Sequence, residues 1–154
     1  MSFLKDYDIT LLTEPNLGVS YARNKGLDNA TGDYICWIDN DDMVFPNYLK
    51  VLYENIGEYD WYIFQRMRDN RYFYLENLDI NDPLKTTWCL WGYCFKRKLW
   101  ENVRFDTNKK VGEDLIIFDI IPNTKGKLIK EVLYRYRWYG NEDSLSHRHN
   151  RGEI

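Results

Sequence analysis

Apolar and polar positions change period several times in the first part of the chain. Residues 9–13 form a short apolar, β-prone run that is followed at once by turn residues, which predicts a strand. Small and apolar residues then recur at helical spacing from 19 to 30, and Gly32 suits a helix stop. Residues 34–38 are an almost unbroken apolar run, as in a parallel strand covered on both faces. This order predicts a right-handed βαβ unit over residues 1–46.

A second helix and a hairpin are predicted next. Pro46 suits the first turn of a helix that ends before Gly57. The expected buried stripe of this helix consists of Tyr48, Leu49, Leu52, Tyr53 and Ile56. Residues 60–67 and 71–76 have strand composition on either side of a short turn, which predicts an antiparallel hairpin.

The last third of the chain predicts two more helices and one long strand. Residues 98–102 favour a short helix, and residues 113–121 favour a longer one that Pro122 ends. Residues 127–139 have strand composition. The tail after Asn141 is polar, and we expect it to be loose.

Composition limits the class of protein. The 154 residues are 44% hydrophobic and 29% charged, which is typical of one folded globular domain. A net charge of -3 offers no electrostatic reason to bind nucleic acid or an anionic membrane. Three cysteines without C-x-x-C spacing predict neither a disulfide framework nor a zinc site. No apolar run is long enough to span a membrane and the N-terminus lacks signal-peptide features, so we expect a cytoplasmic protein.

The strongest candidate for chemistry is an acidic cluster after the run at 34–38. Asp39, Asp41 and Asp42 place three carboxylates within four positions, which is repulsive unless a cation or strong donors neutralise them. All-oxygen ligands favour a hard divalent cation, Mn²⁺ or Mg²⁺. The alternative is a solvated acidic turn. An EF-hand calcium loop is excluded, because Lys50 stands where the closing Glu belongs.

Other side chains have both a functional and a structural interpretation. Glu113 and Asp114 begin a predicted helix, whose dipole would hold them ionised; they are alternatively a plain helix-start pair. Arg23 is an anion contact, a clamp that orients the acidic cluster, or a surface arginine. His147 and His149 are possible metal ligands, or part of a solvated tail.

Aromatic residues are abundant and provide a candidate saccharide surface. They make up 17% of the chain, and flat rings stack well on sugars. Trp88, Trp91 and Tyr93 lie close together in the sequence and are candidates for an acceptor-side wall. The alternative is that this group is partly core.

Several segments together resemble one enzyme family. Residues 18–27, 30–35 and 39–42, in this order, resemble the family-2 type of GT-A glycosyltransferases. Further downstream, the segments that resemble the family are residues 112–114, 136–137 and 144–146. The resemblance implies an α/β fold, with a GT-A (Rossmann-like) sheet flanked by helices and a small antiparallel hairpin.

The resemblance also implies an activity and roles for single residues. Family members transfer a sugar from a nucleotide diphosphate sugar, most often a UDP-sugar, to an acceptor hydroxyl, usually with inversion. By the same resemblance Asp39 lies near the nucleotide ribose, while Asp41 and Asp42 bind Mn²⁺ or Mg²⁺ and, through it, the diphosphate. Asp114 is then the general base.

The same resemblance assigns regions to the rest of the site. Residues 84–139 are expected to form the acceptor-side and catalytic-base region, and residues 140–154 a polar tail. Arg23, Trp88 and Trp91 are candidates for contacts with the bound substrates, and His147 for a metal ligand from the tail.

One departure from the family pattern leaves three functional alternatives open. Family members usually begin with a further strand, helix and strand that build much of the nucleotide-base pocket, whereas this sequence starts at what corresponds to the third strand. We therefore expect a minimal or N-terminally truncated member. The alternatives to a working enzyme are a catalytically weak or inactive fragment that binds nucleotide, and a glycan-binding module. A sheet edge left open would favour homodimerisation.

Overall fold

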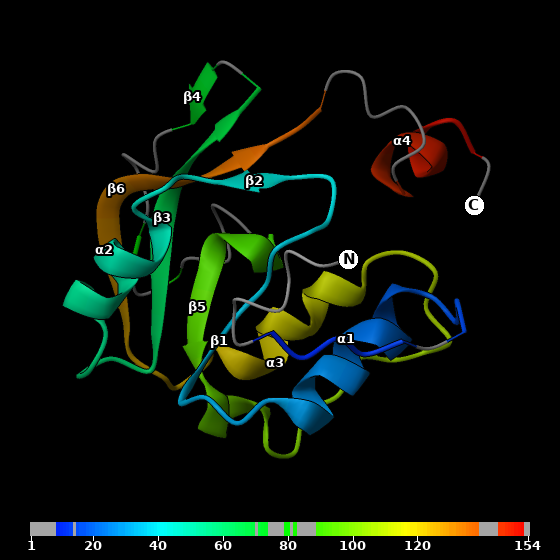
Figure 1. Ribbon diagram of the computed structural model, residues 1–154, viewed down its shortest axis with the longest axis horizontal. Coiled ribbons are helices and arrows are strands. Elements are labelled where there is room, and N and C mark those ends of the chain that lie inside the picture. The colour runs from blue at the N-terminus through cyan, green and yellow to red at the C-terminus, as the bar shows by residue number, and fades with distance from the viewer. Residues whose placement is uncertain are drawn as a thin grey trace.

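The computed structural model describes residues 9–13, 15–69, 71–73, 79–80, 82, 89–138 and 145–152. The fold is a mixed α/β fold in which helices pack against one curved sheet (Figure 1). The helices are α1 (Val19–Asn29), α2 (Tyr48–Asn55), α3 (Ile117–Ile120) and α4 (Leu145–Asn150). Three single turns of 3₁₀ helix are η3 (Leu90–Gly92), η4 (Arg97–Trp100) and η5 (Glu113–Ile116).

The sheet has six strands and one parallel pairing. Its strands are β1 (Tyr34–Cys36), β2 (Met43–Val44), β3 (Trp61–Arg68), β4 (Arg71–Phe73), β5 (Tyr93–Lys96) and β6 (Gly126–Tyr136). Five of them follow the order β1-β5-β3-β6-β2, and β4 pairs with β3. Only β3 and β6 run parallel among the described pairs. The predicted antiparallel hairpin is confirmed as β3 and β4, and the predicted last strand as β6.

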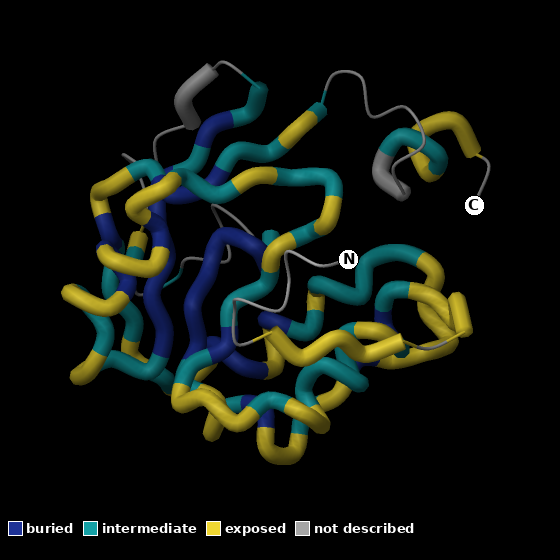
Figure 2. The backbone as a smooth tube through the Cα atoms, viewed as in Figure 1, coloured by how far each residue is buried: buried dark blue, intermediate teal, exposed yellow. Residues whose placement is uncertain are grey.

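The first four residues of β3, Trp61–Phe64, are all apolar and all buried (Figure 2). Trp61 and Ile63 belong to the core on one face, with residues of β5, η4 and α3. Tyr62 and Phe64 belong to the core on the other face, with residues of α2 and β6. Because side chains alternate along a strand, this half of β3 faces both cores and is apolar at every position, whereas Arg66 and Arg68 follow where burial is less complete.

The predicted βαβ unit is wrong. Residues 9–13 form no strand, and β1 pairs antiparallel with β5, with Tyr34 opposite Lys96 and Cys36 opposite Cys94. An apolar run shows that a strand is buried, but it does not show which strand lies beside it or in which direction. The helix of this segment, α1, is confirmed.

Other sequence predictions are corrected in detail. In α2 the buried positions are Tyr48, Val51 and Leu52, whereas Leu49 is 76% exposed and Tyr53 82% exposed. The spacing permits two adjacent stripes, and only the place of the helix on the sheet selects one of them. The predicted helix at 113–121 is η5 followed by α3, and η4 starts one residue before the short helix predicted at 98–102. The tail expected to be loose contains α4.

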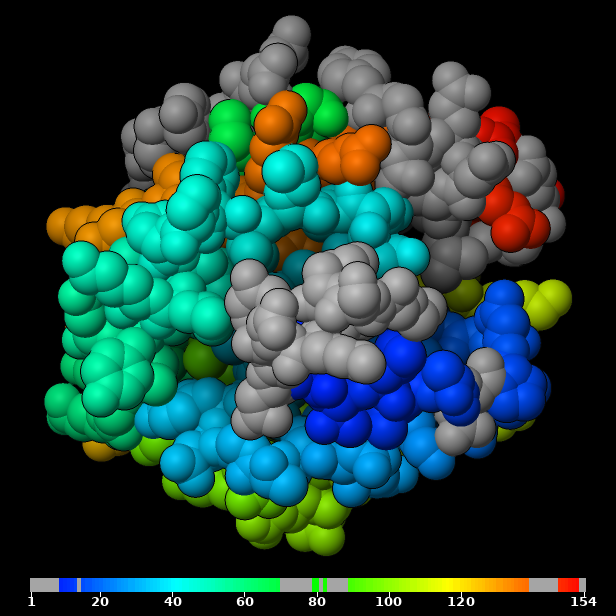
Figure 3. Space-filling view, viewed as in Figure 1, coloured from blue at the N-terminus to red at the C-terminus, as the bar shows by residue number. Residues whose placement is uncertain are grey.

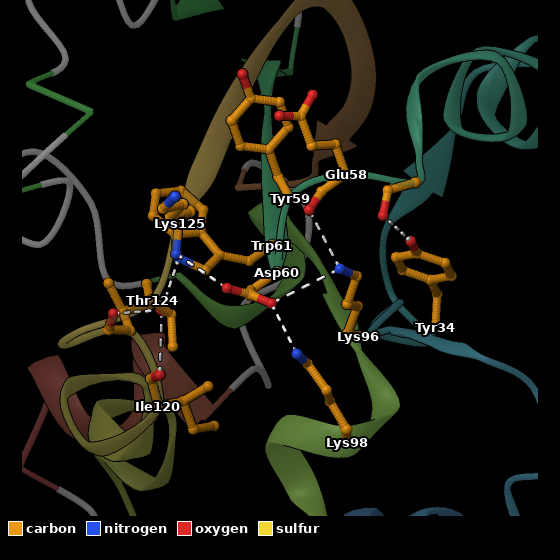
Figure 4. A network of polar contacts seen from close by, with 12 residues as sticks. Tyr34, Glu58, Tyr59, Asp60, Trp61, Lys96, Lys98, Ile120, Thr124 and Lys125 are labelled. Atoms are coloured by element: carbon orange, nitrogen blue, oxygen red, sulfur yellow. Dashed lines mark hydrogen bonds and ion pairs between the residues drawn. The ribbon is translucent and has the colours of Figure 1, made fainter.

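A polar network joins the ends of β3, β5 and β6 (Figure 4). The Asp60 carboxylate, just before β3, accepts a hydrogen bond of 3.1 Å from the backbone N–H of Lys125 and lies 3.0 Å from Lys98 Nζ. Trp61 Nε1 donates to Thr124 Oγ1 at 3.0 Å. These contacts hold the Trp61 ring flat against the start of β6.

Gly126→Ala is expected to destabilise the protein by about 3 kcal/mol or more, at the upper end of overpacking costs. A Cβ atom at Gly126 would lie 2.1 Å from the buried Trp61 ring, so that β6 or the ring must move. Urea unfolding measures the change. The matched control is Gly26→Ala in α1, where a Cβ meets nothing within 4 Å and the better helix propensity of alanine should stabilise the protein. Equal stability of the two variants would contradict the prediction.

No helix among the described residues has both the length and the apolar character that a membrane crossing requires.

Candidate functional site

The three aspartates predicted to bind a cation lie together between β1 and β2 (Figure 1). One carboxylate oxygen from each of Asp39, Asp41 and Asp42 lies within 4.8 Å of the others. The backbone N–H of Asp42 donates to the carbonyl of Asp39 at 3.1 Å, which closes the turn that gathers them. Such a group of oxygen donors fits a hard divalent cation.

Tyr134 of β6 orients two of the three aspartates. Its hydroxyl donates to Asp42 Oδ2 at 2.8 Å and accepts from the backbone N–H of Asp39 at 3.2 Å. The backbone N–H of Arg137 donates to Asp42 Oδ1 at 2.8 Å. Burial nevertheless raises the pKa of Asp42 to about 6, and the neighbouring carboxylates add to this shift. A bound cation would oppose both effects, so the cluster fits a metal in charge as well as in donor type.

Arg23 of α1 joins the acidic cluster to η5. Its guanidinium lies 3.1 Å from Asp39 Oδ1 and 2.7 Å from Glu113 Oε1. It also lies over the Trp37 and Phe105 rings, 5.9 and 5.5 Å from their centres. The side chains of Arg23 and Glu113 are only 11% and 12% exposed, so the pairing is largely shielded from water. This geometry agrees with the interpretation of Arg23 as a clamp that orients the acidic cluster.

Asp114 lies in η5, next to Glu113. Gly112 precedes them with φ 73°, a left-handed conformation that favours glycine and turns the chain into η5. Burial, and then the charge of Glu113, raise the pKa of Asp114 to about 6. A helix start alone would lower the pKa of this carboxyl, but burial outweighs that effect; the group is nevertheless mostly ionised at neutral pH, as expected.

The two described aromatic candidates are both buried and belong to the two core clusters. Tyr93 is fully buried, as in the alternative that makes it part of the core. Trp91 is 9% exposed, and its ring stacks on Tyr134 at 4.6 Å and on Tyr136 at 5.4 Å. Trp88 lies outside the described residues.

The histidine candidates lie on α4. His147 packs on Trp138, with ring centres 4.1 Å apart, and His149 is exposed. In the part of the chain that the structure describes, the group of three aspartates includes neither histidine.

The sequence model of the family described as "Glycosyl transferase family 2" matches residues 2–126. This range is most of the chain and contains the acidic cluster, Arg23 and Asp114. The chain belongs to glycosyl transferase family 2. The resemblance inferred from the sequence motifs is therefore confirmed.

Curated relatives agree with family 2 membership. Glycosyltransferase GlyA of Streptococcus pneumoniae serotype 4 is 30% identical over 86% of this chain and 23% of its own length. The minor teichoic acid biosynthesis protein GgaB of Bacillus subtilis strain 168 is 33% identical over 84% of this chain and 16% of its own length. The chain thus spans less than a quarter of either relative.

Solved structures show the same fold as this family 2 chain. The crystal structure of S. aureus TarS 1–349 in complex with UDP-GlcNAc has a TM-score of 0.73, with 94% of this chain and 47% of that chain covered. The same protein in complex with UDP gives 0.70, covering 89% and 47%. Both are 16% identical to this chain, so the likeness concerns the fold. The expected GT-A fold class is confirmed.

Two residues at the site of this family 2 chain were given no role from its sequence, although Tyr136 belongs to a segment that resembles the family. Tyr134 and Tyr136 lie beyond the family match, yet Tyr134 orients the acidic cluster and both rings stack on Trp91. Their spacing of two in a predicted strand places them on one face, and that is the signal that could have selected them.

Proposed function

We propose that the chain carries the catalytic site of a metal-dependent glycosyltransferase. It would move a sugar from a nucleotide diphosphate sugar, a UDP-sugar, to an acceptor hydroxyl with inversion of the anomeric centre. The observation that carries this proposal is the convergence of Asp39, Asp41 and Asp42, two of them oriented by Tyr134 and one by Arg23. The UDP and UDP-GlcNAc complexes of the similarly folded TarS support the choice of donor.

Asp41 and Asp42 are proposed to hold Mn²⁺ or Mg²⁺. When bound, the cation would stabilise the negative charge that develops on the departing diphosphate. Asp39, fixed by Arg23, is placed in the proposal beside the nucleotide ribose. Because Tyr134 and the Arg137 backbone hold both Asp42 oxygens, this carboxylate is preorganised and loses little freedom when it binds a ligand.

Asp114 is proposed to be the general base. Inversion needs one carboxylate that removes the proton of the acceptor hydroxyl as its oxygen attacks the anomeric carbon, on the face opposite the leaving diphosphate. A pKa of about 6 is well matched to this role, because the group is ionised at neutral pH yet more basic than an ordinary aspartate.

The remaining candidates have supporting roles in the proposal. Trp88 and Trp91 are placed beside the bound sugars. His147 is proposed as a metal ligand from helix α4, part of which is seen at the surface in Figure 3. Self-association through an edge strand of the sheet, β1 or β2, is also proposed. Light scattering that shows a monomer at high concentration would count against that part.

Calorimetric titration with UDP, with and without Mn²⁺, tests the metal site. The native chain is expected to bind UDP in a Mn²⁺-dependent way. Asp42→Ala should weaken this binding at least as much as the about 10- to 100-fold that loss of an outer-shell partner costs. The matched control is Asp33→Ala, which removes an exposed carboxylate at the other end of β1 and should change nothing.

The same titration separates the alternatives. If the affinity for UDP is the same with and without Mn²⁺, or is unchanged in Asp42→Ala, the proposed metal-dependent site is overturned. Metal-dependent binding without any sugar transfer in a screen of donors and acceptors would favour a nucleotide-binding module instead.

A further inference from the structure

A pocket beside Trp91 lies outside the acidic cluster and the general base. It has a volume of about 170 Å³, and its described lining residues are Arg66, Met67, Arg68, Cys89, Trp91 and Tyr136. A cavity of about 150 Å³ accommodates a benzene molecule, so this pocket has room for one small charged group and part of a sugar ring.

The pairing of β3 with β6 brings the side chains of the pocket together. In the parallel pair of β3 and β6, Arg66 lies opposite Tyr134 and Arg68 lies opposite Tyr136. Directly paired positions share a face of the sheet, so two arginines and two tyrosines form a basic and aromatic block. Trp91 of η3 covers this block, with its ring nearly parallel to both tyrosine rings.

The pocket is basic. The described lining includes two arginines and no acidic residue. The Arg66 guanidinium lies 5.4 Å from the centre of the Trp91 ring, and its Nη1 atom is buried with no hydrogen-bond partner among the described residues. The Arg68 guanidinium lies over the Trp138 ring at 5.5 Å. A buried guanidinium donor without an acceptor is costly, and an oxyanion in the pocket would satisfy it.

The pocket is also coupled to the acidic cluster. Trp91 lines the pocket and stacks on Tyr134, whose hydroxyl donates to Asp42. A group held in the pocket therefore lies one aromatic ring away from the residue that orients the proposed metal ligand. This is a suitable place for the part of an acceptor next to its reacting hydroxyl.

From these contacts we infer that the pocket at Arg66, Arg68, Trp91 and Tyr136 binds an oxyanion, phosphate or carboxylate, carried by a saccharide acceptor. The identification of the bound saccharide as an acceptor rests on the proposed function, whereas the binding of an anion in this pocket does not. Arg66 supplies paired donors to the oxyanion, and the Trp91 and Tyr136 rings provide a surface for the attached sugar.

Calorimetric titration of the full chain in EDTA, where the three aspartates repel anions, tests the inference. The probes are glucose 6-phosphate, glucuronate and glucose. Either anionic sugar should bind at least about tenfold more tightly than glucose, as a charge-assisted hydrogen bond implies. The preferred anion distinguishes phosphate from carboxylate. Equal binding of all three sugars would overturn the inference.

Variants connect this binding to the pocket. R66Q and R68Q should each weaken binding of the preferred anionic sugar, with the larger loss in R66Q. K109Q removes an exposed positive charge that lies far from Arg66 and Arg68 in the sequence, and it should not change binding of the anionic sugar. Unchanged binding in both arginine variants would overturn the pocket assignment. If R66Q does not fold, R68Q still tests the pocket assignment, and the comparison of anionic with neutral sugar in the native chain still tests anion binding.

Failure of the two proposals can be told apart. A native chain that binds anionic sugars in EDTA but does not bind UDP with Mn²⁺ would overturn the proposed function and keep the anion pocket. The reverse result would overturn the pocket alone.

Discussion

Asp114→Asn is expected to lower the rate of sugar transfer by about 10²- to 10⁴-fold, the usual contribution of a general base. Asparagine keeps the size of the side chain but cannot take the proton of the acceptor hydroxyl. Binding of UDP with Mn²⁺ should stay unchanged, because Asp39, Asp41 and Asp42 form the cluster without Asp114. Single-turnover transfer from a UDP-sugar and calorimetry of UDP measure the two quantities.

The pH dependence of transfer should change with the same substitution. Since the pKa of Asp114 is about 6, the native rate should rise with pH through 6 and reach a plateau above it. At pH 5 the rate should be about tenfold below the plateau, because the ionised fraction falls tenfold for each unit below the pKa. At saturating Mn²⁺, which keeps Asp42 ionised, the residual rate of Asp114→Asn should not rise with pH in this range.

Folding stability provides the control for Asp114→Asn. Burial raises the folded-state pKa of Asp114 above its ordinary value, so its stabilising contribution is complete below the unfolded pKa and is lost as pH rises through 6. A neutral asparagine should therefore leave the variant at least as stable as the native chain at pH 7. Asp119→Asn, at an exposed position of α3, should alter neither transfer nor stability. Normal transfer by Asp114→Asn would exclude Asp114 as the base.

Arg23→Met is expected to cost about 2–4 kcal/mol of folding free energy, somewhat less than the loss of one partner from a fully buried ion pair. It leaves Glu113, which is 12% exposed, without its cation, and it leaves Asp39, which is 33% exposed, without an orienting donor. The loss for Asp39 is smaller, because water screens its charge. Urea unfolding at neutral pH measures the sum.

A matched variant separates this effect from the loss of an ordinary surface pair. Arg104 pairs with Asp28 at 2.9 Å with both side chains well exposed, and its Nη1 also donates to the backbone carbonyls of Trp100 and Val103. Arg104→Met should therefore cost about 1–2 kcal/mol, less than Arg23→Met. In addition, Arg23→Met should weaken binding of UDP with Mn²⁺, whereas Arg104→Met should not. Equal losses of stability in the two variants would contradict a special role for Arg23.

Local patterns in the sequence predicted an element well where the spacing of its apolar residues or the residues of one turn were sufficient to specify it. The hairpin of β3 and β4 follows from two β-prone runs around a short turn, and Asp69 in that turn has φ 53°, a conformation that aspartate tolerates. Helix α1 follows from spacing alone. Two of the five positions predicted to be buried in α2, Leu49 and Tyr53, are exposed, because they fit the same periodicity as the residues that face the sheet.

The sequence predicted which aspartates form the candidate site, but it did not predict which residues orient them. Asp39, Asp41 and Asp42 are neighbours in the sequence, so their proximity needed no tertiary structure. Their orientation needed it, because Tyr134 lies 92 positions from Asp42, and no local period connects them. The anion pocket likewise depends on the parallel register of β3 and β6.

The sequence by itself therefore determined helices α1 and α2, the β3–β4 hairpin and strand β6, where the carboxylates gather, and to which family the chain belongs, but not strands β2 and β5 or helix α4. These properties depend on residues that lie within one element or one turn of each other. Tertiary structure alone decided that β1 runs antiparallel to β5 and that Arg23, which also contacts Asp39, pairs with Glu113 90 positions away. It also decided that burial raises the pKa of Asp114. Strand direction, long-range pairing and desolvation arise only when distant segments pack together, because the free energy of each depends on neighbours that the chain brings close by folding.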